Sequence, residues 1–418
     1  MAGPNLISVP SLVARVLAAL PAALPAVAVR DGVRWIVAAD PEATTVASGQ
    51  AAFDVLDGLA PSFWAGWLSY DLGRAVERVA PRAVDDLHLP DLALARFDTR
   101  LVIDGDSTSI EGDGASRALL EAALVSAQAE TTPSDLAPGP ALQRWRSTLD
   151  QTTFEAGVRA IVELIRAGEC YQVNFTRRLE SDDPADPVAL FSSLVEHNPA
   201  PHAAFVRTGD VTIVSASPER FLRRDGRRVE TRPIKGTGID AGRLMTSAKD
   251  RAENVMIVDL ARNDLGRVCE YGSIEVPELC AVEEHPGLLH LVSTVRGTLR
   301  ANVGTGALIA ATFPPASITG APKPRVMQAI EDLEPVRRGV YCGAVGWIDE
   351  ANGSLDLNVA IRTFTMAGGR TFLNVGGGIV ADSDPTAEWE ETELKAARLL
   401  EAASIGSRAT RGGRVGAR

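Results

Sequence analysis

The irregular order of strand-like and helix-like segments is the feature that most limits the fold. Apolar runs typical of strands occur at 211–217 (VTIVSAS), 340–349 (VYCGAVGWID) and 370–377 (RTFLNVGG). Helical segments lie between such runs, but without the regular strand–helix alternation of a doubly wound parallel sheet. The order therefore predicts a mixed α+β fold built on large antiparallel sheets.

The segment 131–140 (TTPSDLAPGP) is the clearest linker, because it has three prolines and a glycine between two apolar-patterned regions. It predicts an N-terminal α+β region over 1–140 and a second region over 141–403. Residues 404–418 hold Gly, Ser and Arg with almost no apolar residues, so we expect a disordered tail there.

The charge of the chain excludes some classes of partner. A formal net charge of −12 and a pI near 5.1 argue against nucleic acid or an anionic membrane surface. The apolar stretch 17–29 is interrupted by two prolines and is too short to span a bilayer, so we expect no membrane or targeting segment. The four cysteines have no metal-type or redox-type spacing, which is typical of reduced thiols in a cytoplasmic protein.

Lysine is rare in this chain. Only four of the 42 basic residues are lysines, namely Lys235, Lys249, Lys323 and Lys395. Arginine stays charged in almost any site, whereas a buried lysine amine can lose its proton and attack carbon. Lys235, in the segment PIKGT, is therefore either a surface charge or a candidate nucleophile.

The segment 246–268 (TSAKDRAENVMIVDLARNDLGRV) predicts a helix that begins at the capping residue Ser247. Glu253 lies on the same stripe as Ile257 and Leu260, which is the stripe expected to face inward. A carboxylate on an apolar face needs a partner. The sequence leaves two alternatives open, an ion pair with an arginine and a metal ligand.

A second charged helix is predicted from Asp384, whose side chain would cap the first turn. Glu388, Glu391 and Lys395 fall on one face of this helix, which is either a solvated surface or a site. The residues before it include Gly376, Gly377 and Gly378. Such a stretch either lets backbone N–H groups approach an anion or forms a tight turn.

Three further side chains lie in apolar surroundings or in a rigid loop. Arg362 lies in the apolar segment NVAIRTF, predicted as a strand, where a guanidinium needs an anion. His290 lies in GLLHLVSTVRG and is either a core residue or a catalyst. Thr319 lies in FPPASITGAPK, a segment whose prolines and glycine indicate a rigid loop. No Cys, His and carboxylate motif of a glutaminase is recognisable.

A series of motifs in one order closely resembles the chorismate-utilising enzymes. The motifs are SPERFL (217–222), PIKGT (233–237), KDRAENVMIVDLARNDLGRV (249–268), HLVSTVRG (290–297), SITGAPK (317–323), NVAIRTF (358–364), GGGIVADSDP (376–385) and EWEETELKA (388–396). The resemblance covers residues 145–402. It implies two large antiparallel β-sheets packed face to face with helices outside, a four-layer arrangement to which both regions of the chain contribute.

The resemblance also implies a site for chorismate and Mg²⁺. Carboxylates matching Glu253 and Glu391 would hold the metal, with Glu388 close by. Residues matching Arg362, Lys395 and the backbone of 376–378 would bind the second carboxylate of the substrate. Thr319 would line the ring pocket, although the family commonly has two glycines where this chain has Pro315 and Ala316.

Two positions distinguish the reactions of the family. Relatives that add water to chorismate carry a lysine at the place of Gln172, and glutamine cannot serve as that base. Anthranilate synthases usually have alanine at the place of Lys235, whereas lysine there marks the aminodeoxychorismate synthases. In that branch the lysine amine attacks C2 of the ring and expels the C4 hydroxyl, after which ammonia adds at C4. The product is 4-amino-4-deoxychorismate, the precursor of 4-aminobenzoate and folate.

The same resemblance assigns acid–base work to Glu219 and electrostatic or acid–base help to His290. Positive charge that would favour neutral Lys235 is expected from Mg²⁺ and Arg232. Ammonia would come from a separate glutaminase subunit. Two alternatives remain, an anthranilate synthase with an unusual lysine, and a non-catalytic subunit that binds chorismate or tryptophan.

Overall fold

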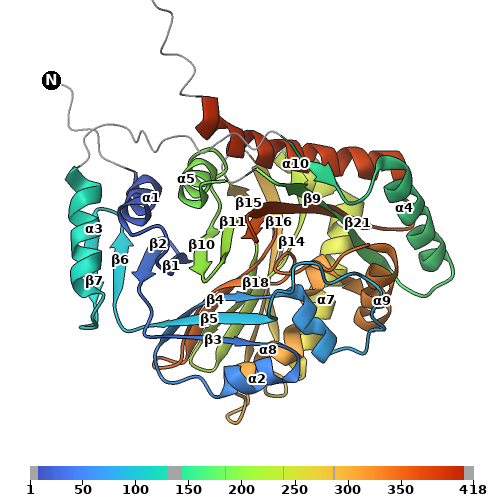
Figure 1. Cartoon of the computed structure of the whole chain (residues 1–418). Coiled ribbons are helices and arrows are strands. Elements are labelled where there is room, and N and C mark those ends of the chain that lie inside the picture. Colours follow the sequence, from blue (N-terminus) through green and yellow to red (C-terminus); the bar gives the residue numbers. More distant parts are fainter. Residues whose placement is uncertain (1–7, 130–143, 184, 239, 286–287, 409–418) are drawn as a thin grey trace, which may run out of the picture.

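Two large antiparallel sheets lie at the centre of the molecule, and helices cover their outer faces (Figure 1). The computed structural model describes residues 8–129, 144–183, 185–238, 240–285 and 288–408. This arrangement confirms the predicted α+β class with two antiparallel sheets.

The first sheet is 11-stranded within the described residues. Its order is β17 (Gly320–Ala321), β9 (Gln172–Ser181), β21 (Arg370–Ile379), β20 (Thr363–Ala367), β11 (Val211–Ser217), β10 (His202–Thr208), β1 (Ala26–Asp31), β2 (Arg34–Ala39), β6 (Arg100–Asp104) and β7 (Ser107–Glu111), with β8 (Arg146–Ser147) against β9.

The second sheet is 10-stranded within the same residues. Its order is β14 (Ile234–Gly238), β16 (Leu288–Thr298), β13 (Arg228–Arg232), β12 (Arg220–Asp225), β19 (Ser354–Val359), β18 (Ala344–Asp349), β4 (Phe63–Leu68), β5 (Leu92–Phe97) and β3 (Ala43–Ala47), with β15 (Glu275–His285) against β16.

Helices form the two outer layers. The outer face of the first sheet is covered by α1 (Val9–Ala19), α3 (Arg117–Ala129), α5 (Pro187–His197) and α10 (Pro385–Arg408). The second sheet is covered by α2 (Gln50–Asp57), α7 (Ala248–Gly266) and α8 (Thr305–Thr312). The remaining helices are α4 (Gln151–Arg166) and α9 (Lys323–Leu333) beside β9, α6 (Ala241–Thr246) beside β14–β16, and the short 3₁₀ turns η1 (Tyr70–Ala75) and η2 (Ala316–Ile318).

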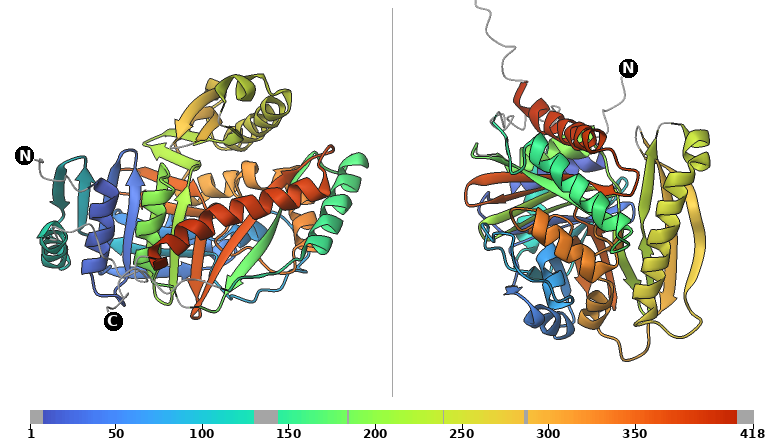
Figure 2. Two further views of the ribbon diagram at one scale, coloured as in Figure 1. Left: turned by 90° about the horizontal axis from the view of Figure 1, so that it is seen from above. Right: turned by 90° about the vertical axis from the view of Figure 1, so that its right-hand side faces the viewer.

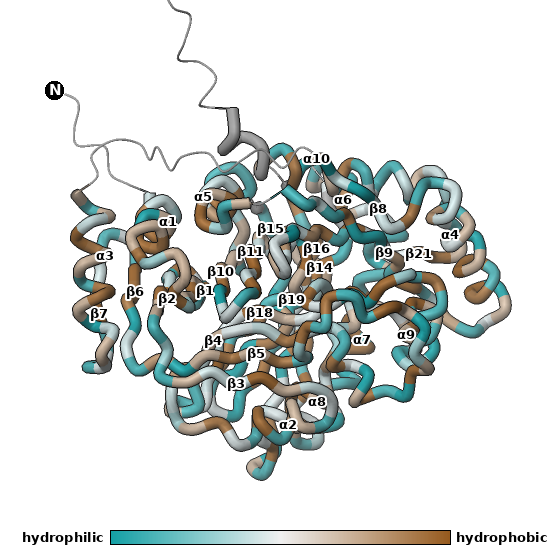
Figure 3. The backbone as a smooth tube through the Cα atoms, viewed as in Figure 1, coloured by the Kyte–Doolittle hydropathy of each residue, from teal (hydrophilic) through white to brown (hydrophobic). Residues whose placement is uncertain are grey.

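A buried apolar layer joins the facing surfaces of the two sheets. Ile213 of the first sheet belongs to the same cluster as Trp67 and Trp347 of the second. The ring of Phe63 stacks on that of Trp347 with a centroid distance of 5.9 Å. Figure 3 shows long hydrophobic stretches on the strands and more hydrophilic residues along α10. Side chains alternate between the two faces of each strand, so the inner faces of both sheets together form one core between the sheets.

Strands from both predicted regions contribute to both sheets, and within each sheet the strands of each region form one continuous block. The two blocks meet where β1 pairs with β10 in the first sheet and where β4 pairs with β18 in the second. The predicted boundary near 140 lies outside the described residues. α10 continues to Arg408, and residues 409–418 again lie outside them.

Two predicted helix starts are confirmed. The Ser247 hydroxyl accepts a hydrogen bond from the backbone N–H of Asp250 at 3.2 Å, and α7 begins at the next residue. The Asp384 carboxylate accepts one from the N–H of Ala387 at 2.9 Å, and α10 begins at Pro385. In both cases a side-chain oxygen satisfies a backbone donor that the helix leaves open.

The segment from β14 to β16 projects from the rest of the molecule, as both views of Figure 2 show in yellow-green to yellow. Leu244, Cys280 and Leu291 form a small apolar cluster of its own. Its helix α7 is held on β16 by the side-chain amide of Asn254, which donates to the carbonyl of Leu291 at 3.1 Å. The apolar contacts of this segment are thus few compared with those of the main core.

The described residues contain no helix that is long and apolar enough to cross a membrane. The four cysteines, Cys170, Cys269, Cys280 and Cys342, are free and buried. Their burial agrees with the prediction of unpaired thiols.

A buried ion pair fastens the end of α7 to the start of α9. The Lys323 ammonium donates to Asp264 Oδ2 at 2.6 Å and to the Thr312 carbonyl at 3.3 Å. Only 9% of the lysine side chain and 12% of the aspartate side chain are exposed. A buried pair of this kind fixes one geometry, since either charge alone would be poorly solvated.

We expect Lys323→Ala to destabilise the protein by about 3 kcal/mol, because Asp264 would stay buried without its counter-ion. Urea unfolding followed by circular dichroism measures the change. Arg166→Ala is a suitable control, since it removes an exposed i,i+3 pair with Glu163 and should cost less than about 1 kcal/mol. An equal loss in both variants would contradict the structural role of the Lys323 pair.

Candidate active site

Three consecutive glycines of β21 form the floor of the site. Gly376, Gly377 and Gly378 pair with Thr176, Phe175 and Asn174 of β9. They therefore lie inside a strand that continues beyond the predicted 370–377, and the alternative of a tight turn was wrong. The sequence could not distinguish a strand from a turn at the third glycine, because glycines occur in turns and also in strands that other groups approach closely.

The positions that Cβ atoms would take at these glycines show how closely other side chains approach the strand. A Cβ at Gly377 would lie 3.2 Å from Glu388 Oε2, 3.8 Å from Lys395 Nζ and 3.9 Å from Glu391 Oε1. A Cβ at Gly378 would lie 2.6 Å from Gln172 Nε2 and 3.3 Å from Lys235 Nζ. The bare backbone thus lets groups from α10, β9 and β14 gather over one strand.

Lys235 enters this site from β14, where it pairs with Leu291 of β16. Only 13% of its side chain is exposed, and its Nζ lies 3.9 Å from Glu253 Oε2. Burial lowers the pKa of the Lys235 amine and the charge of Lys395 lowers it further, while the carboxylates Glu253 and Glu219 act in the opposite direction. Burial has the largest effect.

Arg232 was expected to provide positive charge near Lys235. Its guanidinium instead pairs with Glu283 and lies 3.7 Å from Glu278, both on the neighbouring strand β15. This expectation was wrong, because Arg232 is neutralised by acidic side chains across the sheet. The cation that acts on Lys235 comes from α10, far away in the sequence.

Glu219 lies in the turn between β11 and β12 and is 4% exposed. Burial raises the pKa of its carboxyl to about 7. Hydrogen bonds from the Ser317 hydroxyl and the Ile234 N–H, together with the charge of Lys235, oppose that rise. A carboxyl in this state can give or take a proton near neutral pH.

Ser317 was not singled out in the sequence, although it lies in the motif SITGAPK. Its hydroxyl orients Glu219, a contact between residues almost 100 positions apart. Gln172 is also part of the site. It is fully buried, and neither its amide nitrogen nor its amide oxygen has a partner in the structure. The amide of Gln172, beside Gly378, is therefore free to bind a ligand.

The three predicted residues of α10 lie together at the edge of the glycine strand. Lys395 Nζ donates to the Gly376 carbonyl at 2.8 Å and pairs with Glu391 Oε1 at 2.7 Å. Glu388 accepts a hydrogen bond from the Ser383 hydroxyl at 2.6 Å. Burial raises the pKa of the Glu388 carboxyl, and the negative charge of Glu391 raises it further.

The carboxylates predicted to hold a metal lie on two sides of the site. Glu388 and Glu391 approach Gly377 from α10, whereas Glu253 contacts Lys235 from α7. Across the described ranges, no three acidic, His or Cys side chains converge closely enough to form a closed metal site. Glu388 and Glu391 repel each other, and a bound cation with few protein ligands would relieve that repulsion.

Arg362 lies in the connection between β19 and β20, and not within a strand as predicted. Its φ of 51° is in the left-handed region, which carries a cost for a side chain of this size. Burial lowers the pKa of its guanidinium, as does the nearby Arg398. Among the described residues no carboxylate pairs with Arg362, so it is available to an anion.

Thr319 and His290 are buried residues whose roles stay predictions. The Thr319 hydroxyl donates to the carbonyls of Pro315 and Ala316 at 3.1 and 3.4 Å, which stabilises the loop after α8. His290 is 2% exposed and lies on β16 opposite Thr237. Because side chains alternate along a strand, His290 points to the face of β16 opposite that of Leu291. Leu291 is the residue that pairs with Lys235.

The chain is similar to known proteins over most of its length. Residues 28–401 match the family model "chorismate binding enzyme". Aminodeoxychorismate synthase component 1 of Escherichia coli (strain K12) is 40% identical over 351 residues, which cover 80% of this chain and 75% of that protein. Anthranilate synthase component 1 of Thermus thermophilus is 38% identical over 358 residues, 81% of this chain and 77% of that protein.

A solved structure is similar as well. The crystal structure of anthranilate synthase component I from Streptococcus pneumoniae has a TM-score of 0.77 and 28% sequence identity, covering 89% of this chain and 93% of that one. The match of sequence and fold extends through both sheets and the site between α7, α10 and β21. The chain belongs to the chorismate binding enzyme family.

Proposed function

We propose that this protein aminates chorismate at C4 and releases 4-amino-4-deoxychorismate. The observation that carries the proposal is the buried Lys235 amine, which lies between Glu253 and Glu219 above the glycine strand. A nucleophilic lysine needs a neutral amine, and burial favours that form. The name of the 40% identical Escherichia coli relative supports the same reaction.

Lys235 and Glu219 share the proton work of the first step. The neutral amine attacks C2 of the ring, both conjugated ring double bonds shift by one position toward C4, and the C4–O bond breaks. Glu219, protonated near neutral pH, gives its proton to the departing hydroxyl, which leaves as water. Ammonia then attacks C4, the bond from C2 to Lys235 breaks, and the Glu219 carboxylate takes the proton that the new ammonium group loses.

The two carboxylates of chorismate are bound beside the glycine strand, in neighbouring parts of the site. Arg362 and Lys395 supply fixed positive charge to one of them, and the N–H groups of 376–378 border the same space. Glu388 and Glu391, with Glu253 across the site, would hold Mg²⁺ against the other. Bound there, the metal would neutralise the ring carboxylate and the acidic side chains around it.

Ammonia is expected from a separate glutaminase subunit. The name "component 1" of the Escherichia coli relative supports a partner component. The chain itself carries no recognisable glutaminase motif, so the isolated protein should use ammonium salts and not glutamine.

Lys235→Ala should lower the rate of 4-amino-4-deoxychorismate formation by at least about 100-fold, because the nucleophile is lost. Lys235→Arg should be equally impaired, since it keeps the charge but cannot lose a proton at neutral pH. Chromatographic identification of the product from chorismate, Mg²⁺ and ammonium measures this. Calorimetry with chorismate checks that both variants still bind it.

Two outcomes of this experiment would overturn the proposal. Anthranilate as the product of the wild-type protein would assign the chain to the branch of its Thermus relative. Chorismate binding without turnover under any condition would favour a regulatory subunit.

The rate should also depend on pH through Glu219. Because the carboxyl must carry a proton in the first step and its pKa is about 7, kcat should fall as the pH rises above that value. Glu219→Gln should lower kcat roughly 100-fold or more and abolish this descending limb. A pH–rate profile at saturating chorismate measures both, and an unchanged limb in the variant would contradict the assignment.

A further inference from the structure

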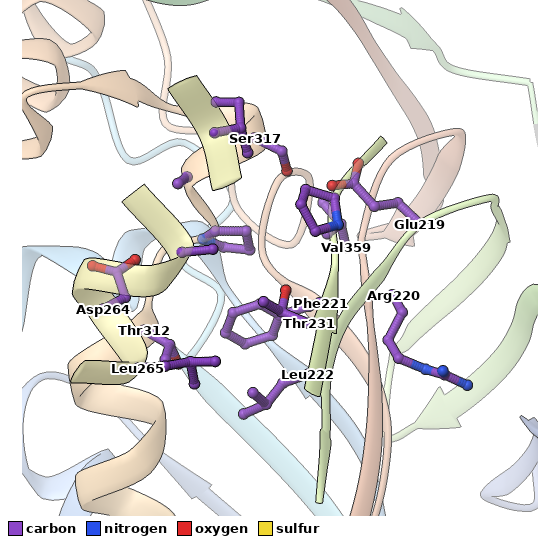
Figure 4. Close-up of a pocket in the computed structure, with 15 residues that line it drawn as sticks. Glu219, Arg220, Phe221, Leu222, Thr231, Asp264, Leu265, Thr312, Ser317 and Val359 are labelled. Atoms are coloured by element: carbon purple, nitrogen blue, oxygen red, sulfur yellow. The ribbon is translucent and has the colours of Figure 1, made fainter. Parts of the chain in front are cut away.

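A small cavity lies behind Glu219, on the side away from the glycine strand. Its volume is about 30 Å³, and its walls come from β12, α7 and the loop between α8 and β17. Figure 4 shows Glu219 and Asp264 at opposite ends of the cavity, with Phe221 between them and Ser317 above. Lys235, Gln172 and Gly378 are not part of its lining, so it is distinct from the space directly over the glycine strand.

The cavity has the size and polarity of a water site. A volume of about 30 Å³ has room for roughly two water molecules, and such a molecule needs two to four polar partners. Glu219, Asp264, Ser317, Thr312 and Thr231 all line the walls. Cavities that stay dry are lined by apolar groups alone, which is not the case here.

The polar groups that line the cavity can still form hydrogen bonds to water. Lys323 engages only Oδ2 of Asp264, so within the described residues the other carboxylate oxygen remains open to a donor. The Ser317 hydroxyl donates to Glu219 and can still accept a hydrogen bond. A water at the Glu219 end of the cavity would therefore hydrogen-bond to the active-site carboxyl and to the Ser317 hydroxyl.

We propose that this cavity is a water site of the active centre, and that its water solvates the Glu219 carboxyl from behind. The inference rests on the proposed function only in that Glu219 exchanges a proton during the reaction. The water adjusts how readily the carboxyl gives up that proton, because every other contact of Glu219 comes from fixed protein groups.

The charged and polar groups around Glu219 come from each packed element. Lys235 and the Ile234 N–H face it from β14, Ser317 from η2, and Cys342 from the turn before β18. Asp264, neutralised by Lys323, lies across the cavity on α7. The cavity can be altered without changing any of the charged or hydrogen-bonding groups that face Glu219.

Ala261 of α7 offers that change, because its methyl group lines the cavity. Ala261→Val adds two methyl groups and should expel the water. Loss of solvation disfavours the ionised carboxyl, so its pKa should rise. The descending limb of the pH–rate profile should then move to higher pH by roughly half a unit or more. Chorismate affinity should stay unchanged.

Ala123→Val is the matched control. Ala123 is equally buried in a helix, α3, but packs in the other core cluster. The control carries the same helix-propensity cost and the same added volume, and its profile should coincide with that of the wild type. Thermal melts of both variants check that they fold.

If the Ala261→Val variant fails to fold, the Ala261→Gly variant tests the proposal instead. The larger cavity would admit more water, so the limb should move to lower pH. An unmoved limb in the folded variants, a shift in the wrong direction, or a crystal structure of the wild-type protein with a dry cavity would each overturn the proposal. Anthranilate as the wild-type product would refute only the proposed function, since the C4 hydroxyl is lost in that reaction too.

Discussion

The active site depends on one constraint, the burial of a lysine amine and a carboxyl group close to each other. In water Lys235 would be charged and Glu219 ionised at neutral pH. Desolvation acts on both in the direction of the neutral forms, lowering the pKa of the amine and raising that of the carboxyl. Burial therefore favours an uncharged amine on Lys235 and a protonated carboxyl on Glu219. The neighbouring carboxylate of Glu253 limits this effect, and the charge of Lys395 supports it.

The glycine strand makes that burial compatible with substrate binding. Any side chain at Gly377 or Gly378 would occupy the space into which Glu388, Gln172 and Lys235 point. The strand also keeps its hydrogen bonds to β9, so the floor is rigid. Rigid elements hold reacting groups more accurately than loops do. The absence of Cβ atoms thus permits the close approach, and the pairing with β9 holds the strand in place.

Sequence reasoning identified the parts of the site better than their arrangement. Helix caps such as Ser247 depend on neighbours three residues away, and they were predicted correctly. The strand at 370–377 was also predicted, whereas the placement of Arg362 in a turn depends on pairing with distant strands, which local patterns do not contain. The pairing of Arg232 with Glu283 across β15 and β16 was hidden for the same reason. The contact of Ser317 with Glu219 required the folded chain.

The pairing of early with late strands in both sheets has a consequence for the time at which the site forms. Phe63 pairs with Asp349 and Ala26 with Arg207, so both sheets close only through contacts of very long sequence separation. Contacts of this kind form slowly, because much loop entropy is lost before they are made. The helix that brings Lys395 and Glu391 also leaves the ribosome after every strand of the two described sheets. A chain that has not yet completed α10 consequently carries no assembled anion site, and its reactive amine stays an ordinary protonated lysine until α10 docks.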